Sequence, residues 1–178
     1  MITINRQLTS GVAEQAKRSP RLRSNHNFHA DYAEPVNRML NAFEPGTYVR
    51  PHKHESPDKC EVFILLTGRA LALRFDDTGT IVEHAVLDGA SGVYGVEFAP
   101  REWHSIVSLA PGTVLYEVKP GPYAPIGDKN FAPWAPAEGS PEAADYMASL
   151  LAGLALSKAA SEHVSPKTVS NLTEPLKK

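Results

Sequence analysis

The segment Arg50-Pro-His52-Lys-His54 constrains this chain more than any other part of its sequence. Successive side chains of a β-strand point to opposite faces, so His52 and His54 project from one face, close enough to share a cation. Neutral imidazole is a common ligand of Zn, Fe, Mn, Ni and Cu ions. The pair therefore predicts a metal site held by β-structure.

The residues that surround this pair follow a wider pattern. Gly46 precedes the histidines, Glu61 follows them, and Gly68 comes after the glutamate. This arrangement resembles the first motif of the cupin superfamily, except that the gap from His54 to Glu61 is longer than usual. The extra residues, within 55–60, include Ser, Pro and Asp, which favour turns. We therefore expect a longer loop that leaves Glu61 in a strand.

A second cupin motif is present in a shortened form. Pro100 precedes His104, but no glycine separates the two and no asparagine follows the histidine. The resemblance implies that one divalent transition metal is held by four residues: His52, His54, Glu61 and His104. Three imidazoles and a carboxylate would leave one or two coordination positions open on Zn, Fe, Mn or Ni.

A closer resemblance, to the WbuC-type cupin-fold metalloproteins, covers roughly residues 5–138. The segments that carry it are 19–23, 27–29, 37–40, 46–54, 75–79, 103–104, 117–123 and 131–134. It implies a single cupin domain with a bound metal, often associated with bacterial surface-polysaccharide genes. It does not fix the reaction.

Short apolar runs between Gly, Pro and Asp also favour an all-β fold. The expected strands are 36–43, 47–54, 60–66, 70–75, 80–87, 93–98, 104–109 and 113–119. One helix is expected at 7–18 and another at 141–157, after the capping pair Ser140-Pro141. The predicted fold class is a cupin-type jelly-roll β-barrel or sandwich with a short N-terminal helix and a C-terminal helix.

The chain divides into four expected parts. They are an N-terminal helix and arm packing on the barrel (1–35), the cupin barrel (36–123), a proline-rich wrap with the C-terminal helix (124–161), and a mobile tail (162–178). Tyr123 and Trp134 are expected to pack under the wrap; covering the pocket or stacking on a sugar ring is the alternative. The apolar stripe of the second helix, which consists of Ala143, Met147, Leu150, Leu151 and Leu154, is expected to serve core or dimer packing.

Composition narrows the class of partner. The chain has 178 residues, a net charge of -2 and a pI near 6.4. This charge argues against a nucleic-acid-binding protein.

The absence of a signal-like start or a long apolar run predicts a cytoplasmic protein without a membrane partner. Cys60 is the only cysteine, so no intramolecular disulfide forms. Exposed edge strands favour a homodimer.

Two strand positions suggest further site residues. Tyr48 and Arg50 share the parity of His52, so we expect them to face the same interior and contact the substrate. An Arg50 that faces solvent or is purely structural is the alternative. Glu117, if it points inward, is the expected catalytic residue, as a general base or a partner that orients a histidine. A salt bridge on the outer face is the alternative.

Basic residues concentrate before the barrel. Arg21 and Arg23 are expected to bind the anionic part of the ligand, because a guanidinium recognises phosphate through two parallel hydrogen bonds. A solvated surface is the alternative reading of this segment.

These features predict a metalloenzyme that acts on a small polar substrate such as a sugar phosphate or nucleotide sugar, with isomerase-like or epimerase-like chemistry. One alternative is a binding or sensing protein without turnover, and another is an Fe-dependent dioxygenase. An acid or base facing the metal would favour the enzyme, whereas apolar and hydrogen-bonding walls alone would favour the sensor.

Overall fold

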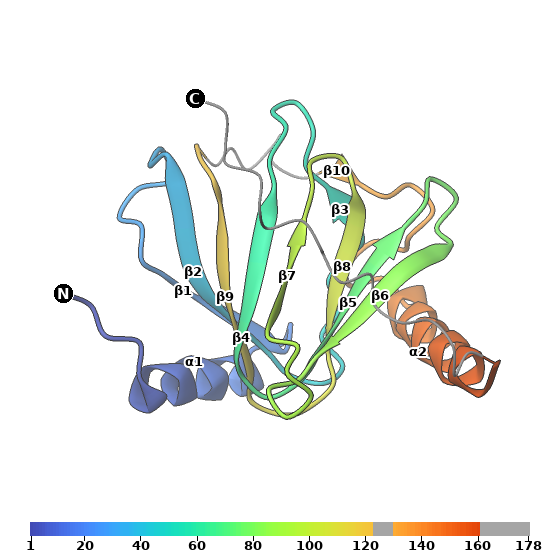
Figure 1. Cartoon of the computed structure of the whole chain (residues 1–178), viewed down its shortest axis with the longest axis horizontal. Coiled ribbons are helices and arrows are strands. Elements are labelled where there is room, and N and C mark those ends of the chain that lie inside the picture. Colours follow the sequence, from blue (N-terminus) through green and yellow to red (C-terminus); the bar gives the residue numbers. More distant parts are fainter. Residues whose placement is uncertain (123–129, 161–178) are drawn as a thin grey trace, which may run out of the picture.

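The computed structural model describes residues 1–122 and 130–160, with side chains described up to residue 154. Two five-stranded antiparallel sheets face each other as a sandwich (Figure 1). The first contains, in order, β1 (Arg23–Asn27), β2 (Val36–Phe43), β9 (Thr113–Pro120), β4 (Glu61–Thr67) and β7 (Gly95–Phe98). The second contains β10 (Asn130–Phe131), β3 (His52–Lys53), β8 (Trp103–Ser108), β5 (Ala70–Phe75) and β6 (Ile81–Leu87). The predicted jelly-roll fold class is confirmed.

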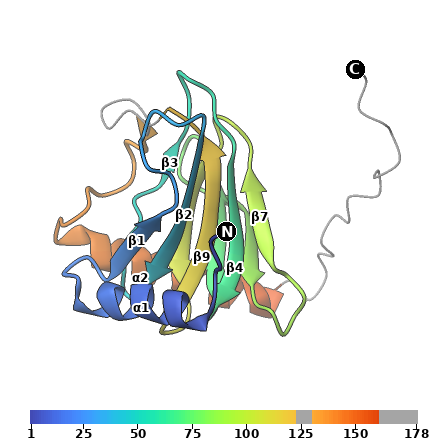
Figure 2. The ribbon, with the colours of Figure 1, turned by 90° about the vertical axis from the view of Figure 1, so that its left-hand side faces the viewer.

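Helix α1 (Arg6–Arg18) covers part of the outer face of the first sheet (Figure 2). The side chain of Asn5 caps the helix by accepting a hydrogen bond from the backbone N–H of Leu8 at 3.0 Å. Val12 and Ala16 pack against Leu40 and Val114 of the sheet in a buried cluster. Both faces of β2 are therefore covered, and the sheet can carry polar side chains inward because α1 supplies apolar burial outside.

Helix α2 (Glu142–Ala160) packs on the outer face of the second sheet (Figure 1). Ala143 and Met147 contribute to a buried cluster with Leu71 and Leu73. Most of the predicted apolar stripe therefore serves core packing, while Leu151 remains 36% exposed.

The segment that precedes α2 packs on the same face. The Trp134 ring lies 5.2 Å from the ring of Phe75 and 6.1 Å from that of Trp103, measured between centroids. Trp134 therefore packs as expected, whereas Tyr123 and residues 162–178 lie outside the described part.

The strand pattern differs from expectation in three places. The expected strand 47–54 is reduced to β3, because Pro51 has no N–H to donate to a ladder. The arm before the barrel contributes β1, which pairs along its whole length with β2. The short β10 adds a further strand to β3.

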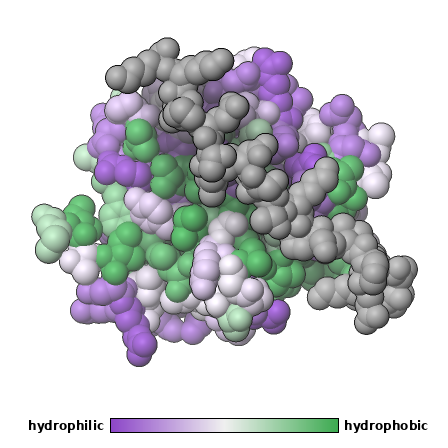
Figure 3. Space-filling view, in the orientation of Figure 1, coloured by the Kyte–Doolittle hydropathy of each residue, from purple (hydrophilic) through white to green (hydrophobic). Residues whose placement is uncertain are grey.

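The outer face of the first sheet is not fully covered. Val36, Ile64 and Leu66 are 43%, 40% and 38% exposed. Hydrophobic surface is also visible on the left-hand half of Figure 3, the side on which this sheet lies. No helix in the described part of the chain is long and apolar enough to span a bilayer.

Candidate metal centre and its cavity

Four buried side chains from three strands and an adjoining loop converge between the sheets. They are His52, His54, Glu61 and His104, and one ligand atom from each lies within 4.8 Å of those of the others. Two ligands of one ion stand at most about 4.4 Å apart, twice a bond of roughly 2.2 Å. A small adjustment of side chains would therefore bring all four within bonding distance of one ion.

The strands explain this convergence. His52 of β3 is directly opposite His104 of β8, so the two imidazoles face the interior from adjacent strands of one sheet. Glu61 is the first residue of β4 in the other sheet. The loop before it holds the extra residues without displacing Glu61 from its strand, as expected.

The histidine rings turn their Nε2 atoms to one carboxylate oxygen. The Nε2 atoms of His104, His54 and His52 lie 2.9, 3.4 and 3.9 Å from Oε2 of Glu61. Three imidazole nitrogens that converge on one point beside a carboxylate form an arrangement that can hold a metal ion.

Backbone carbonyls fix the orientation of two of these rings. Nδ1 of His104 lies 2.8 Å from the carbonyl oxygen of Glu102, and Nδ1 of His52 lies 3.0 Å from that of Arg50. A carbonyl only accepts, so Nδ1 carries the proton and the neutral ring presents a lone pair at Nε2. Phe98 stacks on His104 with centroids 4.3 Å apart and planes at 13°.

His104 consequently stands between two oxygen acceptors, Glu102 O and Glu61 Oε2. A neutral imidazole has one proton and can satisfy only one of them. The second contact requires either another proton or a metal ion between Nε2 and the carboxylate. The donor set therefore fits a divalent transition metal.

Glu61 is 1% exposed and its charge is balanced locally. Burial alone would raise the pKa of Glu61, but the ammonium of Lys119 and the rings of His104 and His54 outweigh burial. They hold the pKa of the carboxyl well below its usual range. The carboxylate is thus kept in the ionised form that metal ligation needs.

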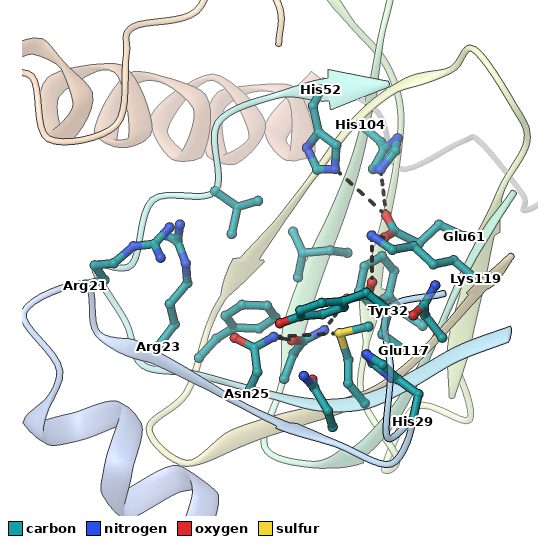
Figure 4. Close-up of a pocket in the computed structure, with 18 residues that line it drawn as sticks. Arg21, Arg23, Asn25, His29, Tyr32, His52, Glu61, His104, Glu117 and Lys119 are labelled. Atoms are coloured by element: carbon teal, nitrogen blue, oxygen red, sulfur yellow. Dashed lines mark hydrogen bonds and ion pairs between the residues drawn. The ribbon is translucent and has the colours of Figure 1, made fainter. Parts of the chain in front are cut away.

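A cavity of about 420 Å³ opens beside the four residues (Figure 4). Its walls combine polar and apolar side chains, and most come from the inner face of the first sheet. The lining residues are Arg21, Arg23, Asn25, Asn27, His29, Tyr32, Asn37, Met39, Asn41, Phe43, Val49, His52, Glu61, Phe63, His104, Ile106, Glu117 and Lys119. A ligand in this cavity would reach the metal centre and a row of hydrogen-bonding groups together.

Glu117 points into the cavity and is 7% exposed. Its carboxylate accepts a short hydrogen bond from the side-chain amide of Asn41 and lies 3.4 Å from the ammonium of Lys119. Of the two positions considered for Glu117, the structure has the inward one. Figure 4 shows Glu117 and Lys119 below the cluster of Glu61, His52 and His104.

Arg21 and Arg23 lie on the cavity wall on the side away from His29 (Figure 4). Both guanidiniums are engaged by Glu138. Arg21 donates two hydrogen bonds to it, at 2.6 and 2.8 Å, and Arg23 donates one at 2.7 Å. Arg23 also donates to the carbonyl of Tyr48 at 2.6 Å. The arginine pair thus already holds one carboxylate, which belongs to the protein itself.

Tyr48 and Arg50 do not line the cavity, contrary to expectation. The Tyr48 hydroxyl donates to the carbonyl of Pro136 at 2.9 Å, and burial raises the pKa of Tyr48 to about 12. Arg50 donates to the carbonyl of Ala132 at 2.8 Å and lies over the ring of Phe131. Residues 47–51 form no regular strand, so side-chain parity does not extend back from His52.

Several cavity residues were not anticipated as site residues. They are Lys119, Asn25, Asn27, Asn37, Asn41 and Tyr32. Lys119 shares the strand parity of Glu117, and Asn37 and Asn41 share that of Met39. The alternation of side chains along these strands could therefore have predicted that Lys119, Asn37 and Asn41 face the interior. Polar residues spaced by two in a strand whose other face is apolar indicate a polar interior.

A family described as a domain of unknown function (DUF6016) matches residues 4–87, and no protein with a curated description matches significantly.

Three solved structures illustrate the similarity. The capsular polysaccharide assembling protein CapF from Staphylococcus aureus is similar over 61% of this chain, with 19% identity and a TM-score of 0.51, and this chain spans only 29% of its length. A cupin 2 domain-containing protein from Halorhodospira halophila is similar over 81% of this chain and 84% of its own, with 15% identity and a TM-score of 0.45. L-ribose isomerase from Cellulomonas parahominis is similar over 65% of this chain and 70% of its own, with 14% identity and a TM-score of 0.48. At 19% identity and a TM-score of 0.51, the similarity to CapF concerns the fold alone, which is the predicted jelly-roll sandwich of two antiparallel sheets.

Proposed function

We propose that this protein is a metal-dependent enzyme that moves a proton on a small polyhydroxylated substrate, in the manner of a sugar isomerase or epimerase. The observation that carries the proposal is the inward position of Glu117, a carboxylate on the wall of the cavity that also holds the metal centre. An acid or base that faces the metal centre favours an enzyme over a binding or sensing protein.

The proposed cofactor is one divalent ion, Zn, Fe, Mn or Ni, bound by His52, His54, Glu61 and His104. Bound there, it would polarise substrate oxygens and stabilise negative charge on them. The ligands come from both sheets, so the fold itself sets their geometry. Because the four ligands include no thiolate, we propose an ion that accepts nitrogen and oxygen ligands.

The chain supplies the proton-transfer group. Glu117 lies opposite Phe63, two residues along β4 from the ligand Glu61. The amide of Asn41 and the ammonium of Lys119 hold its carboxylate, so Glu117 is oriented before a substrate arrives. In this proposal Glu117 takes a proton from the carbon beside a carbonyl. It returns the proton to the neighbouring carbon, or to the same carbon after the planar intermediate has turned its other face to Glu117.

The substrate is proposed to be a carbohydrate in bacterial surface-polysaccharide metabolism. The support is the sequence resemblance to WbuC-type proteins and the amide-rich cavity wall. CapF, which has a similar fold, is a capsular polysaccharide assembling protein. A sugar phosphate or nucleotide sugar would additionally require an anion site, which Arg21 and Arg23 would provide on release of Glu138.

Metal content tests the first half of this proposal. Wild-type protein loaded with Zn²⁺ should hold about one ion per chain, and His54→Ala or Glu61→Gln should lower that occupancy strongly. His84→Ala is a suitable control, because His84 is exposed and outside the cluster. Unchanged occupancy in the cluster variants would rule out this metal centre.

Proton exchange tests the second half. Metal-loaded protein in D₂O should incorporate deuterium into a responsive aldose or ketose, observed by NMR, and Glu117→Gln should abolish incorporation while metal occupancy is retained. Glu83→Gln, on the exposed face of β6, is the matched control. Sugar binding without exchange would favour the non-catalytic binding protein, and oxygen consumption with Fe²⁺ would favour the dioxygenase.

A further inference from the structure

The cavity contains buried polar groups that the metal centre and Glu117 do not use. Asn37 is 1% exposed, and neither the oxygen nor the nitrogen of its side-chain amide has a hydrogen-bond partner within residues 1–122 and 130–160. His29 is 7% exposed, and its Nε2 likewise has no partner there. Buried polar groups are normally paired, because an unpaired one costs free energy. Both residues line the cavity.

The protonation of His29 follows from its contacts. Nδ1 lies 3.1 Å from the backbone N–H of Arg38, which can only donate. Nδ1 also lies 3.0 Å from the carbonyl oxygen of Arg38, but that oxygen already accepts from the N–H of Phe28 at 2.9 Å, whereas a proton on Nδ1 would point at the N–H of Arg38 and leave it without an acceptor. Nδ1 of a neutral His29 is therefore the acceptor, and its proton is on Nε2. The free position on His29 is consequently a hydrogen-bond donor.

The two residues continue a row that begins at the metal centre. Asn37 of β2 is directly opposite Lys119 of β9. Lys119 lies beside Glu61, and its ammonium is 3.4 Å from that carboxylate. On the other side, the pairing of Asn27 with Met39 and of Phe28 with Arg38 places His29 next to Asn37. Figure 4 shows His29 at the opposite end of the cavity from His52 and His104.

The hydrogen-bonding groups at the Asn37 and His29 end of the cavity indicate which ligand groups can bind there. The amide N–H groups of Asn37 and the Nε2–H of His29 are donors, and the amide oxygen of Asn37 is an acceptor. A hydroxyl both donates and accepts, so a pair of hydroxyls satisfies all of them. Phosphate or carboxylate only accepts, would leave the Asn37 oxygen unpaired, and would approach the carboxylate of Glu117.

We propose that Asn37 and His29 form a second subsite, which binds neutral hydroxyl groups of a carbohydrate ligand at a distance from the metal. This inference rests on the proposed function, since the other end of the ligand is held at the metal centre. The subsite makes the cavity specific for hydroxyl-bearing ligands, because an analogue without these hydroxyls leaves Asn37 and His29 buried and unpaired.

Binding of a set of neutral mono- and disaccharides to the Zn²⁺-loaded protein, measured by calorimetry, tests the subsite. Asn37→Leu keeps the size of the side chain and removes its amide, so the best-bound sugar should bind about tenfold more weakly or worse. His29→Asn should also weaken binding, because it keeps an acceptor for the Arg38 N–H but loses the Nε2 donor. His84→Asn, the same exchange at an exposed histidine of β6 outside this cavity, should leave affinity unchanged.

The stability of the metal-free protein provides a measurement that does not depend on any ligand. Asn37→Leu should raise the unfolding midpoint, because it replaces a buried amide without partners by an apolar group. Asn41→Leu is the matched control on the same face of β2. It should lower the midpoint, because Asn41 bonds to Glu117 and Asn25.

The outcomes separate this inference from the proposed function. If no neutral sugar binds the Zn²⁺-loaded wild-type protein, or if Asn37→Leu binds as well as wild type, the subsite is overturned. If Zn²⁺ itself does not bind, the proposed function fails, and the melting comparison decides on the subsite. A lower midpoint for Asn37→Leu would then overturn it, and a higher one would support it.

Discussion

The Nζ atom of Lys119 lies 3.4 Å from Oε1 of Glu61, and both side chains are buried between the sheets. Among the lysines and arginines that the structure describes, Lys119 is the one recorded as an ion-pair partner of this carboxylate. A bound divalent ion would provide a second and stronger one. The importance of Lys119 for stability should therefore depend on whether metal is present.

Lys119→Met should destabilise the metal-free protein by about 3–5 kcal/mol, because it leaves a buried carboxylate without its counterion. Zn²⁺ should restore part of this loss, so the rise in unfolding midpoint on adding Zn²⁺ should be larger in the variant than in wild type. Lys17→Met, which removes an exposed pair on α1, is the control. Equal losses with and without Zn²⁺ would show that Lys119 does not balance the charge of Glu61.

Glu138 should make the stability depend on pH. Partial burial raises the pKa of Glu138, but the hydrogen bonds and charges of Arg21 and Arg23 outweigh burial and lower the pKa. A group with a lowered folded-state pKa stabilises the fold above its usual pKa, near 4.5, and loses that contribution as pH falls through the folded value. Because the carboxylate is partly exposed, the contribution is about 1 kcal/mol or less.

Glu138→Gln should accordingly melt below wild type at pH 7, and the difference should vanish in the acid range below the folded-state pKa. Thermal unfolding over a series of pH values measures this. Glu83→Gln removes a more exposed partner of Arg74 and serves as the comparison. The difference in unfolding midpoint between Glu138→Gln and wild type could instead stay constant down to acid pH. The contacts of Arg21 and Arg23 would then not depend on the charge of Glu138.

The same variant tests whether Arg21 and Arg23 form an anion site. In wild type an anionic ligand must displace Glu138, whereas in Glu138→Gln the two guanidiniums lose their competing charge. Affinity for a sugar phosphate such as glucose 1-phosphate should therefore rise by about tenfold, and it should fall with added salt. Equal affinity of both proteins for glucose 1-phosphate would mean that Arg21 and Arg23 only stabilise the segment around Glu138 and bind no anionic ligand.

Much of the fold followed from local patterns, and the exceptions have local causes. The helix at 6–18 and the strands 36–43 and 70–75 match the predicted ranges within a residue, because alternation and capping residues mark them clearly. The prediction of a strand through residues 47–51 was wrong, because Pro51 has no N–H to donate and interrupts the hydrogen bonds between strands. Strand β1 was missed because its sequence, Arg-Ser-Asn-His-Asn, is polar throughout and its inner face lines a cavity.

The candidate site likewise has a part that the sequence predicts and a part that it does not predict. The histidines and Glu61 were predictable, because metal ligation demands particular residue types at fixed spacing. The pairing of Arg21 and Arg23 with Glu138 was not, since their partner is more than a hundred positions away and no local pattern connects them. The same holds for the row from Glu61 to His29, which depends on the register of four strands.

The exposed apolar surface of the first sheet leads to a prediction about assembly. Ile64 and Leu66 lie on its outer face beyond α1, and a homodimer would bury them. Light scattering at micromolar concentration should give twice the 19.3 kDa of one chain, and Ile64→Lys should reduce the mass to that of the monomer. Val82→Lys, on the edge strand β6, should leave the dimer intact. A monomeric wild-type protein would end this proposal.

Gly121 lies where two backbone segments meet beside the second subsite. A Cβ at this position would stand 1.8 Å from the carbonyl oxygen of Glu34 and 2.8 Å from Nδ2 of Asn37. A backbone atom cannot move aside as a side chain would, so Gly121→Ala should push β2 away from the end of β9. We expect a loss of stability of about 1–3 kcal/mol, measured by chemical denaturation.

Two other glycines are matched controls for Gly121→Ala, because an added Cβ would meet nothing within 4 Å at either position. Gly89→Ala should be nearly neutral, and Gly11→Ala, within α1, should stabilise the protein by up to about 1 kcal/mol through helix propensity. The shift of β2 should also move Asn37, so Gly121→Ala should weaken sugar binding while Zn²⁺ occupancy is retained. If Gly121→Ala unfolds at the same denaturant concentration as Gly89→Ala, the close approach of residues 34 and 121 is wrong, and with it the position of Asn37.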